Sequence, residues 1–307
     1  MDIQFIEGVM SASYDKLLTP SHLKSFEDLS KRQFLDLLKT HEIGRVEKNN
    51  IDLMMLEEEI KHKEFLLSLI DKDHLIFKVL YINFDHLFLS NLMKSYHLGL
   101  KYQKLVDNLS NFDELRYENF IINSISGQLD LEEIEFLNNL IDVTKNLDAQ
   151  SISDKIIMIL HQNIMNQLNK KTDKVIINYL NTETTLLNVM LLIRSKKSNR
   201  DFQYFESNIL GGGMIDKHIL IELFNGSIEE FGKYLSLHFD SNLTDAFKHV
   251  SNIDFLSTIN IAFDKYMDLF LEDMSFNNVG FSPVIHFTLL KRKQLRLLKE
   301  KYYQIKE

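Results

Sequence analysis

The stretch that decides the fold class spans residues 153–168 and reads SDKIIMILHQNIMNQL. Its apolar positions at four-residue intervals are Ile156, Leu160, Ile164 and Leu168. Residues at this spacing share one face of an α-helix, whereas a half-buried strand would alternate every second residue. Ser153 stands where an N-cap residue is expected. The stretch therefore predicts an amphipathic helix that begins after Ser153.

Helix start and stop signals recur elsewhere in the chain. Thr19-Pro20 supplies an N-cap and a proline at the first helical position, and Ser30 with Gln33 has capping-box spacing. Gly44 suits a left-handed stop after that second helix. Two further helix openings are predicted, at Ser227–Glu230 and Ser251–Asp254. The β-branched run 175–177 lies inside a helical period and is not expected to form a strand.

A helix is also predicted over Met54–Leu69. Two acid–base pairs at i,i+4 stand on it, Glu57 with Lys61 and Glu59 with Lys63. Such pairs stabilise an exposed helix in this order. We therefore interpret them as a solvated face.

The composition agrees with an all-α protein. The 307 residues are 45% hydrophobic and 26% charged, which is ordinary for a globular chain. Only 2 prolines and 10 glycines occur, although sandwiches and barrels need many turn residues. The chain has no cysteine, which excludes disulfides, zinc–thiolate sites and cysteine nucleophiles.

Charge and hydropathy limit the partners. The net charge of -9 disfavours nucleic acid, whose phosphates attract basic proteins. The N-terminus has an acid, Asp2, where a signal peptide has basic residues. The longest apolar candidate, residues 65–93, is interrupted by charges and is too polar to span a membrane. We expect a cytoplasmic protein that reaches a membrane only through a partner.

Known catalytic motifs are absent from the sequence. The Gly211–Gly213 run lacks the lysine of a phosphate-binding loop, and we interpret it as a connection between helices. No His-Glu-x-x-His zinc motif and no Gly-x-Ser-x-Gly elbow occurs. Asp73-His74 and Asp85-His86 are adjacent pairs whose side chains diverge on a helix. We therefore predict no catalytic, metal or cofactor site, although a triad assembled in space stays open.

A weak internal repeat links three apolar helices. They cover residues 84–94, 184–194 and 293–299, each with a polar residue near its start and a basic residue near its end. The polar residues are Asp85, Thr185 and Gln294. Because apolar helices with basic ends are common, the pattern leaves a true threefold repeat open.

The last helix is a local exception to the acidic balance. Residues 291–307 contain seven basic and two acidic residues, a net charge of +5. This strip could bind an acidic partner or a membrane surface. It could equally be a solvated face with favourable charge at a helix C-terminus.

The order of these segments resembles the rotor-linking C subunit of bacterial and archaeal V-type (A-type) ATPases, whose counterpart in the eukaryotic vacuolar pump is the d subunit. The resemblance covers nearly the whole chain and rests on segments that follow in the family's order: residues 17–23, 34–39, 84–94, 188–194, 210–215 and 280–284, and the helix from Leu289. No single segment is specific; their order and spacing carry the resemblance.

The chain departs from the family pattern at several positions. The family asparagine of the first repeat helix falls on Phe88, and the family aspartate of the second falls on Thr185. In the last helix Arg292, Gln294 and Leu297 replace the usual Glu, Glu and Asn. Val9 and Ser11 replace the arginines of the opening helix. The polar contacts of the family are therefore not assumed here.

The resemblance implies an all-α fold of three similar helical lobes, pseudo-threefold around a central funnel. The expected lobes are residues 1–103, 104–209 and 210–307. It implies a non-catalytic subunit without cofactors, a socket that links the central stalk to the membrane rotor ring and transmits torque. The candidate partner contacts are Lys94, Arg194, Lys291, Arg292, Lys293 and Arg296.

Two hypotheses that assign the chain to other functional classes of protein stay open. One is a helical scaffold or signalling protein unrelated to the pump. The other is an all-α enzyme whose site is assembled in space, which a deep pocket with convergent carboxylates or histidines would favour.

Overall fold

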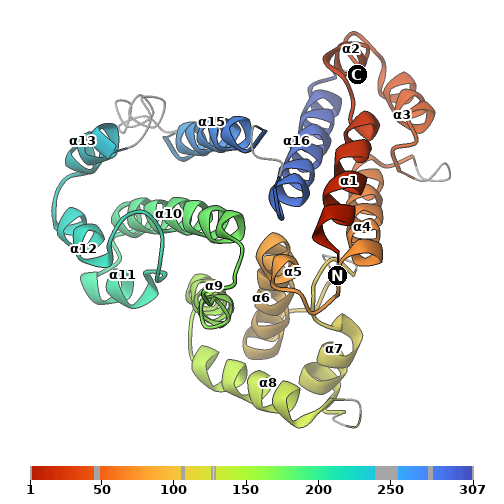
Figure 1. The fold of residues 1–307 in the computed structure, drawn as a ribbon. Helices are drawn as coiled ribbons and strands as arrows, with labels where there is room; N and C mark the ends of the chain where they lie inside the picture. Colours follow the sequence, from red (N-terminus) through yellow and green to blue (C-terminus); the bar gives the residue numbers. More distant parts are fainter. Residues whose placement is uncertain are drawn as a thin grey trace. The chain divides into compact units, whose positions relative to one another are not determined.

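The computed structural model describes residues 2–44, 49–104, 108–125, 127, 129–238, 255–275 and 279–305. Across these residues the chain folds into helices joined by turns, and no strand is present (Figure 1). The all-α prediction is confirmed.

The chain divides into two compact units. The first unit comprises residues 1–156 and 279–307. Its elements are α1 (Ile3–Ser13), η1 (Tyr14–Lys16), α2 (Pro20–Lys24), α3 (Lys31–Thr40), α4 (Ile51–Leu69), α5 (Leu75–Leu80), α6 (Ile82–Leu98), α7 (Glu114–Asn123), α8 (Leu131–Thr144), the start of α9 (Ala149–Met165) and α16 (Ser282–Gln304).

The second unit comprises residues 157–278. It contains the rest of α9, α10 (Lys174–Lys197), α11 (Phe202–Asn208), α12 (Lys217–Asn225), α13 (Ile228–His238) and α15 (Phe255–Ser275). These units do not coincide with the three lobes expected from the resemblance, whose boundaries stay a prediction.

The capping signals account for several helix starts. Thr19 accepts a hydrogen bond from the His22 amide at the start of α2, and Ser30 forms a capping box with Gln33 at the start of α3. Ser227 and Glu230 cap each other's amides at the start of α13. These predictions are confirmed. The start signal at 251–254 lies outside the described residues.

The helix that was expected to follow Ser153 begins earlier than predicted. α9 starts at Ala149, and the Asp148 carboxylate accepts the Ser151 amide 2.8 Å away, so Ser153 lies inside the helix. An aspartate carboxylate can supply this cap as well as a serine hydroxyl. The apolar stripe is confirmed where it is helical, because Ile156 and Ile164 are buried. Leu168 lies beyond the helix end.

Gly44 has the left-handed conformation expected of it, with φ +74°. A Cβ at this position would lie 2.7 Å from the Cβ of Met54, closer than side-chain carbons approach. Glycine therefore serves both the turn after α3 and its close packing on α4.

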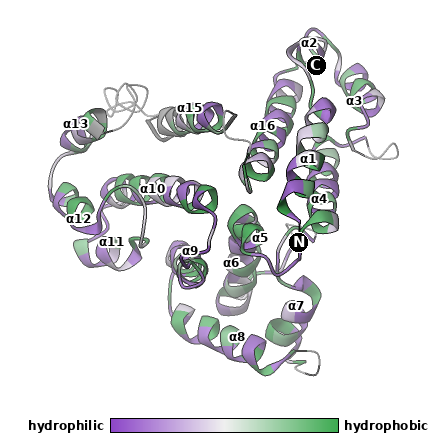
Figure 2. Cartoon of the chain, in the orientation of Figure 1, coloured by the Kyte–Doolittle hydropathy of each residue, from purple (hydrophilic) through white to green (hydrophobic). Residues whose placement is uncertain are grey.

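Each unit has its own hydrophobic core. In the first unit α16 packs against α1 and α4, and a core cluster joins Phe26 and Phe34 to Leu298. In the second unit α10 packs against α11 and α12 around Leu192, Phe205 and Phe231. Figure 2 shows hydrophobic and hydrophilic residues interspersed along α8, whose buried residues Leu137, Leu140 and Thr144 share one helix face.

Candidate functional site

The most densely charged buried region is the seam between α4 and α16. Lys291 Nζ lies 2.7 Å from Glu58 Oε1, and Arg292 Nε donates to Glu59 Oε1 at 2.7 Å. Glu58 Oε2 also accepts a hydrogen bond from Lys61 Nζ at 3.1 Å. Both glutamates are buried, so these pairs lie in a medium that screens charge weakly.

This seam corrects the solvated face that the sequence predicted on α4. Glu59 and Lys63 are both buried, and Glu59 pairs with Arg292 of a distant helix. Acids and bases at i,i+4 indicate an exposed face only when no other helix covers them. Here Arg292 of α16 meets Glu59, and the loop before α7 meets Lys63, which residue spacing within α4 could not reveal.

Arg292 is held by three kinds of contact. Besides Glu59, its Nη1 donates to the Leu80 carbonyl at 2.7 Å, which caps the end of α5. Its guanidinium lies over the rings of Tyr81 and Phe84, at 4.9 and 5.5 Å from their centroids. Cation–π contacts of this kind favour arginine in a partly desolvated place. The Arg292 contacts therefore fasten α16 to both α4 and the α5–α6 corner.

The seam shifts the titration of two neighbours. Burial opposes ionisation of Glu58, but Lys291 and Lys61 hold its pKa below the usual range. Burial, with the charges of Arg292 and Lys291, lowers the pKa of His62 to about 3. His62 Nε2 lies 2.9 Å from Thr288 Oγ1, whose hydroxyl donates to the Val284 carbonyl. The Thr288 oxygen must therefore accept a hydrogen bond from the Nε2–H of neutral His62.

A second polar network lies next to the seam, around Lys63, which shares the Tyr81 ring with Arg292. Lys63 Nζ donates to the carbonyls of Leu109 and Ser110 at 2.8 and 2.6 Å and lies 5.0 Å from the centroid of the Tyr81 ring. Burial lowers the pKa of Lys63. Lys196 has the same role in the second unit, where it caps the Phe224 carbonyl at the end of α12. In both units a lysine satisfies carbonyls that no helix partner reaches.

Asp85 anchors the loop that Lys63 caps. Its carboxylate accepts the Asn111 amide at 2.6 Å, the Asn111 side-chain amide at 2.8 Å and the Ser110 hydroxyl at 2.8 Å. Burial raises the pKa of Asp85 to about 6, against the opposing hydrogen bonds and Lys63. The loop before α7 is thus tied to α6 through one side chain.

The other two residues of the repeat pattern make the same contact. Thr185 Oγ1 on α10 accepts the Met214 amide at 2.7 Å, in the loop before α12. Gln294 Oε1 on α16 accepts the Leu18 amide at 3.0 Å, in the loop before α2, and its Nε2 donates to the Leu18 carbonyl at 2.8 Å. Asp85, Thr185 and Gln294 therefore each anchor a loop that precedes a short helix. We call them the three loop anchors.

The second anchored loop has additional support. Asn188 exchanges two hydrogen bonds with the backbone of Leu210, at 2.9 and 3.0 Å. Gly213 has φ +89°, and a Cβ there would lie 3.1 Å from Thr185 Oγ1. The prediction that Gly211–Gly213 connects helices is confirmed, since the run lies between α11 and α12.

The six candidate partner contacts fall into different surroundings. Lys291 and Arg292 are committed to the seam, as described above. Arg296 lies 4.0 Å from Glu300 on its own helix, and it is exposed, as is Arg194. Lys94 and Lys293 are half-buried. Contact of these six with a partner stays a prediction.

Most of the C-terminal basic strip is neutralised within the chain. Its ion pairs, beyond those of Lys291, Arg292 and Arg296, join Lys299 to Asp52 at 2.6 Å and Lys301 to Glu27 at 3.1 Å. Lys306 lies outside the described residues. These ion pairs therefore join α16 to α4 and to the turn after α2.

Two pockets open on the first unit. One, of about 400 Å³, is lined by His22, His41, Glu58, Lys291 and Gln294. The His22 and His41 rings lie 4.9 Å apart, while Glu58, Lys291 and Gln294 are committed to the bonds described above.

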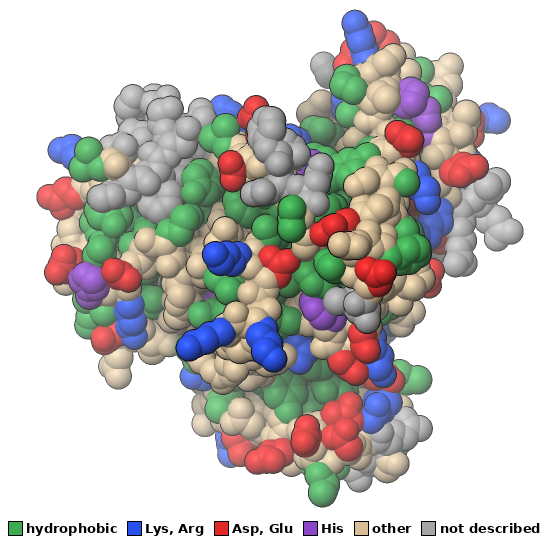
Figure 3. Space-filling view, in the orientation of Figure 1, with side chains coloured by type: hydrophobic (Ala, Val, Ile, Leu, Met, Phe, Trp, Pro, Cys, Tyr) green, Lys and Arg blue, Asp and Glu red, His purple; other side chains and the backbone are tan. Residues whose placement is uncertain are grey.

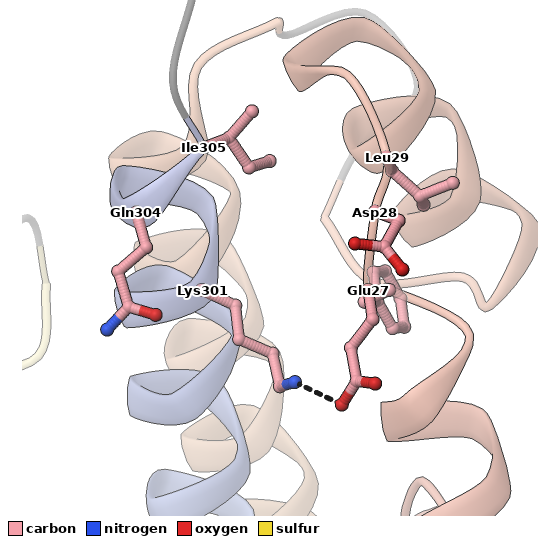
Figure 4. A pocket seen from close by; sticks show the side chains of 7 residues that line it. Glu27, Asp28, Leu29, Lys301, Gln304 and Ile305 are labelled. Atoms are coloured by element: carbon pink, nitrogen blue, oxygen red, sulfur yellow. Dashed lines mark hydrogen bonds and ion pairs between the residues drawn. The ribbon is translucent and has the colours of Figure 1, made fainter.

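The other pocket, of about 610 Å³, lies between the turn after α2 and the end of α16. Figure 4 shows its Glu27–Lys301 ion pair across the opening, with Gln304 and Ile305 along one wall. This pocket is wide and mixed in charge, and one ion pair crosses it.

Two other kinds of site are missing from the part of the chain that the structure describes. Among the described residues, no group of three or more His, Asp or Glu is placed to hold a metal ion. In the same described ranges, no helix has the length and apolar character needed to cross a bilayer.

Sequence reasoning named the three loop anchors as a repeat but missed what they bind. It also missed Glu58, Glu59 and Lys63 as buried charges. The available signal was the stretch Glu57–Lys63, which has five charged residues and a single apolar one, Ile60, and so no apolar stripe.

Comparison with known proteins identifies no family. No protein-family model matches the chain, and no curated protein matches it significantly.

Proposed function

We propose that this chain is a non-catalytic rotor subunit of a V-type ion-translocating ATPase. It links the central stalk to the membrane rotor ring and transmits torque, without a cofactor or a reaction of its own. In this role it lies on the cytoplasmic face of the membrane, which it meets only through the ring. Nucleic acid has no part in it.

The observation that carries the proposal is the recurrence of the loop anchors. Asp85 stands near the start of α6, and Thr185 and Gln294 stand in the middle of α10 and α16. Each accepts a backbone amide from a loop that opens a new run of helices. The anchors follow a cyclic order. α6 holds the loop before α7, α10 holds the loop before α12, and α16 holds the loop before α2.

The helices between the anchors follow one order three times. A short helix comes first, α2, α7 or α12, and a helix opened by a capping box follows, α3, α8 or α13. Further helices complete each run, α4 with α5–α6, α9 with α10, and α15 with α16, while α11 stands outside this order. This repeated order supports three similar lobes in a pseudo-threefold arrangement around a central funnel.

Contacts between runs follow the same cycle. α4 packs on α16, His86 Nε2 of α6 lies 3.0 Å from the Ser153 carbonyl of α9, and Tyr179 of α10 packs on Phe270 of α15. In each case the third helix of one run meets the last helix of the run before it. Each of these contacts lies within one of the two units. Firm packing inside a unit suits a subunit that transmits torque, because a loose joint would absorb rotation.

The residues that depart from the family pattern still form the hydrogen bond to the loop amide. Thr185 replaces an aspartate and Gln294 replaces a glutamate, yet each still offers an oxygen to a loop amide. The hydrogen bond requires an acceptor and not a charge. The substitutions are thus compatible with a diverged member of the resembled family.

The test is to tag the chain at its natural level, solubilise native membranes gently and identify the co-purifying proteins by mass spectrometry. Recovery of stalk and rotor-ring subunits in fixed ratio supports the proposal. Recovery of the intact pump from the same membranes without this chain contradicts it. That outcome would favour the scaffold or signalling reading.

Charge reversal at Lys293 and Arg296 to Glu then tests the partner contacts. These two are better choices than Lys291 and Arg292, whose reversal would break the α4–α16 seam and so unfold the chain locally. We expect weaker co-purification of the pump subunits at unchanged thermal stability. Unchanged co-purification would remove these two residues from the interface.

An enzyme with a spatially assembled site is supported less well. The pocket beside His22 and His41 is its best location, but three of the polar side chains there already serve internal contacts.

A further inference from the structure

The segment that contains α7 and α8 has a strong excess of acidic residues. Residues 113–148 contain nine acidic and two basic residues, a net charge of -7 out of -9 for the whole chain. Figure 3 shows acidic side chains gathered over this helix pair. The exposed carboxylates belong to Asp113, Asp130, Glu132, Glu135, Asp142 and Asp148.

Apolar side chains are exposed on the same two helices. Leu115 on α7 is 65% exposed and Leu131 on α8 is 84% exposed. Ile122 on α7 and Ile125, just after the end of α7, are also exposed. Leu115 and Ile122 are two helical turns apart, so they share one face of α7, about 10 Å from each other. We call these four residues with the six carboxylates the α7–α8 face.

Fixed contacts hold the two helices of this face together. The rings of Phe112 and Phe136 stack with centroids 5.6 Å apart. Arg116 Nη2 donates to Glu133 Oε2 at 2.6 Å, which joins the first turn of α7 to the first turn of α8. The surface is therefore formed before any partner binds, so binding need not order it.

The combination of charge and exposed leucines selects the partner. An acidic surface is repelled by phosphate backbones and by anionic lipid headgroups. Carboxylates alone would be well solvated, whereas each exposed large apolar side chain of the same segment is stabilised when a partner removes it from water. Basic side chains would meet the carboxylates while apolar ones cover Leu115 and Ile122.

A basic segment within the chain is already used elsewhere. The C-terminal strip pairs with acids of α4, of its own helix and of the turn after α2. The C-terminal strip is therefore not the occupant, and we look to a basic segment of another molecule.

We propose that the α7–α8 face is a docking site for a basic amphipathic helix of a partner protein. Apolar residues of that helix, spaced by one or two turns, contact Leu115, Ile122 and Leu131 while its lysines and arginines face the surrounding carboxylates. The site would bind such a helix whether or not the chain belongs to a rotor.

The test uses the full chain and a synthetic 18-residue helical peptide with leucines on one face and lysines on the other. A scrambled peptide of identical composition is the first control. Binding is measured by fluorescence anisotropy at low and high salt, and the contact region by hydrogen exchange. We expect saturable binding of the amphipathic peptide, protection within residues 113–148, and weakening as salt rises.

Two variants separate charge from apolar contact. Glu132→Lys with Glu135→Lys should raise the Kd about tenfold, which corresponds to ~1.4 kcal/mol. Leu115→Asn with Leu131→Asn should weaken binding severalfold at unchanged net charge. The matched control is Glu222→Lys with Glu229→Lys, an equal charge change on exposed positions of α12 and α13, which should leave the Kd unchanged.

Several outcomes would overturn the proposal. Equal affinity for the scrambled peptide would show non-specific charge attraction. Equal loss in the Glu222/Glu229 control would show an effect of net charge alone. Failure of the peptide to bind a folded chain that does bind anionic or neutral vesicles through the same face would assign this surface to a membrane.

Discussion

α16 and the α7–α8 pair are both strongly charged in sequence, with net charges of opposite sign, yet the structure uses them differently. The cations of α16 meet acids from α4 and from the turn after α2, and the innermost pairs are buried. The acids of α8 stand mostly exposed, with Glu133 paired to Arg116 as a local exception.

The difference shows that a run of like charges does not by itself predict whether its side chains are buried in ion pairs or exposed to water. What decides is whether a helix distant in sequence presents the opposite charge. For α16 that helix is α4, more than 200 residues away, so the strip became part of the fold. For α8 the acids remain on the surface and are available to another molecule.

The largest effect that tests this contrast is expected from Arg292→Met. Removing the guanidinium leaves Glu59 charged and buried without its partner, which should lower the free energy of unfolding by about 3 kcal/mol. Urea unfolding followed by circular dichroism measures it. Arg296→Met, on an exposed turn of the same helix, should change stability by less than about 0.5 kcal/mol.

A double variant refines this prediction. Arg292→Met with Glu59→Met removes both charges and should recover much of the lost stability, because the desolvation cost of the pair disappears as well. Equal losses for Arg292→Met and Arg296→Met would contradict the distinction between a buried seam and a solvated strip.

Asp85 gives the next largest effect, and it depends on pH. Its pKa rises from 3.8 to about 6 on folding, so the folded chain binds the proton more tightly than the unfolded chain. The contribution of Asp85 to stability is therefore fully present below pH 3.8 and is lost as pH rises through about 6. This shift, which already includes the opposing charge of Lys63, corresponds to roughly 3 kcal/mol.

Asp85→Asn is the control for this titration, since an amide does not ionise. Comparing urea midpoints of both proteins between pH 4 and pH 7 isolates the contribution of Asp85. The wild-type chain should lose stability relative to the variant as pH rises. A difference that does not change with pH would refute the buried titration.

A smaller effect is expected at the second loop anchor. Thr185→Val leaves the Met214 amide without its acceptor, but water can reach this part-exposed loop, so the cost should be about 1 kcal/mol. Hydrogen exchange should speed up at Met214. Thr182→Val on the same helix is the control, because the Thr182 hydroxyl bonds to the Asn178 carbonyl of its own helix. Faster Met214 exchange in both variants would mean that the loop does not depend on the anchor.

Local features of the fold were predictable from the sequence. Capping residues such as Thr19 and Ser30 act within three residues of their partners, so spacing alone identifies them. The all-α class followed from scarce proline and glycine and from apolar stripes. The start of α9 was misplaced because Asp148 and Ser153 are both competent caps, and tertiary packing chose the earlier one.

Features that depend on distant segments were not predictable. Glu59 on α4 gives the same local pattern whether water or Arg292 lies above it. The repeat of Asp85, Thr185 and Gln294 was visible as spacing, but their common contact with loop amides required the folded backbone. The sequence thus indicated which residues of the candidate site recur, and the structure showed what they bind.

The smallest effect is expected on the α7–α8 face itself. Glu132→Gln with Glu135→Gln should change the free energy of unfolding by less than about 0.5 kcal/mol, because both carboxylates are exposed and relief of repulsion offsets the loss near the helix start. Glu133, between them in sequence, is the contrast. It accepts the Asp130 amide and pairs with Arg116, so Glu133→Ala should cost about 1 kcal/mol. Equal losses of stability for all three glutamates would show that the acids of α8 stabilise the fold, as the cations of α16 do. They would then not be available to bind a partner.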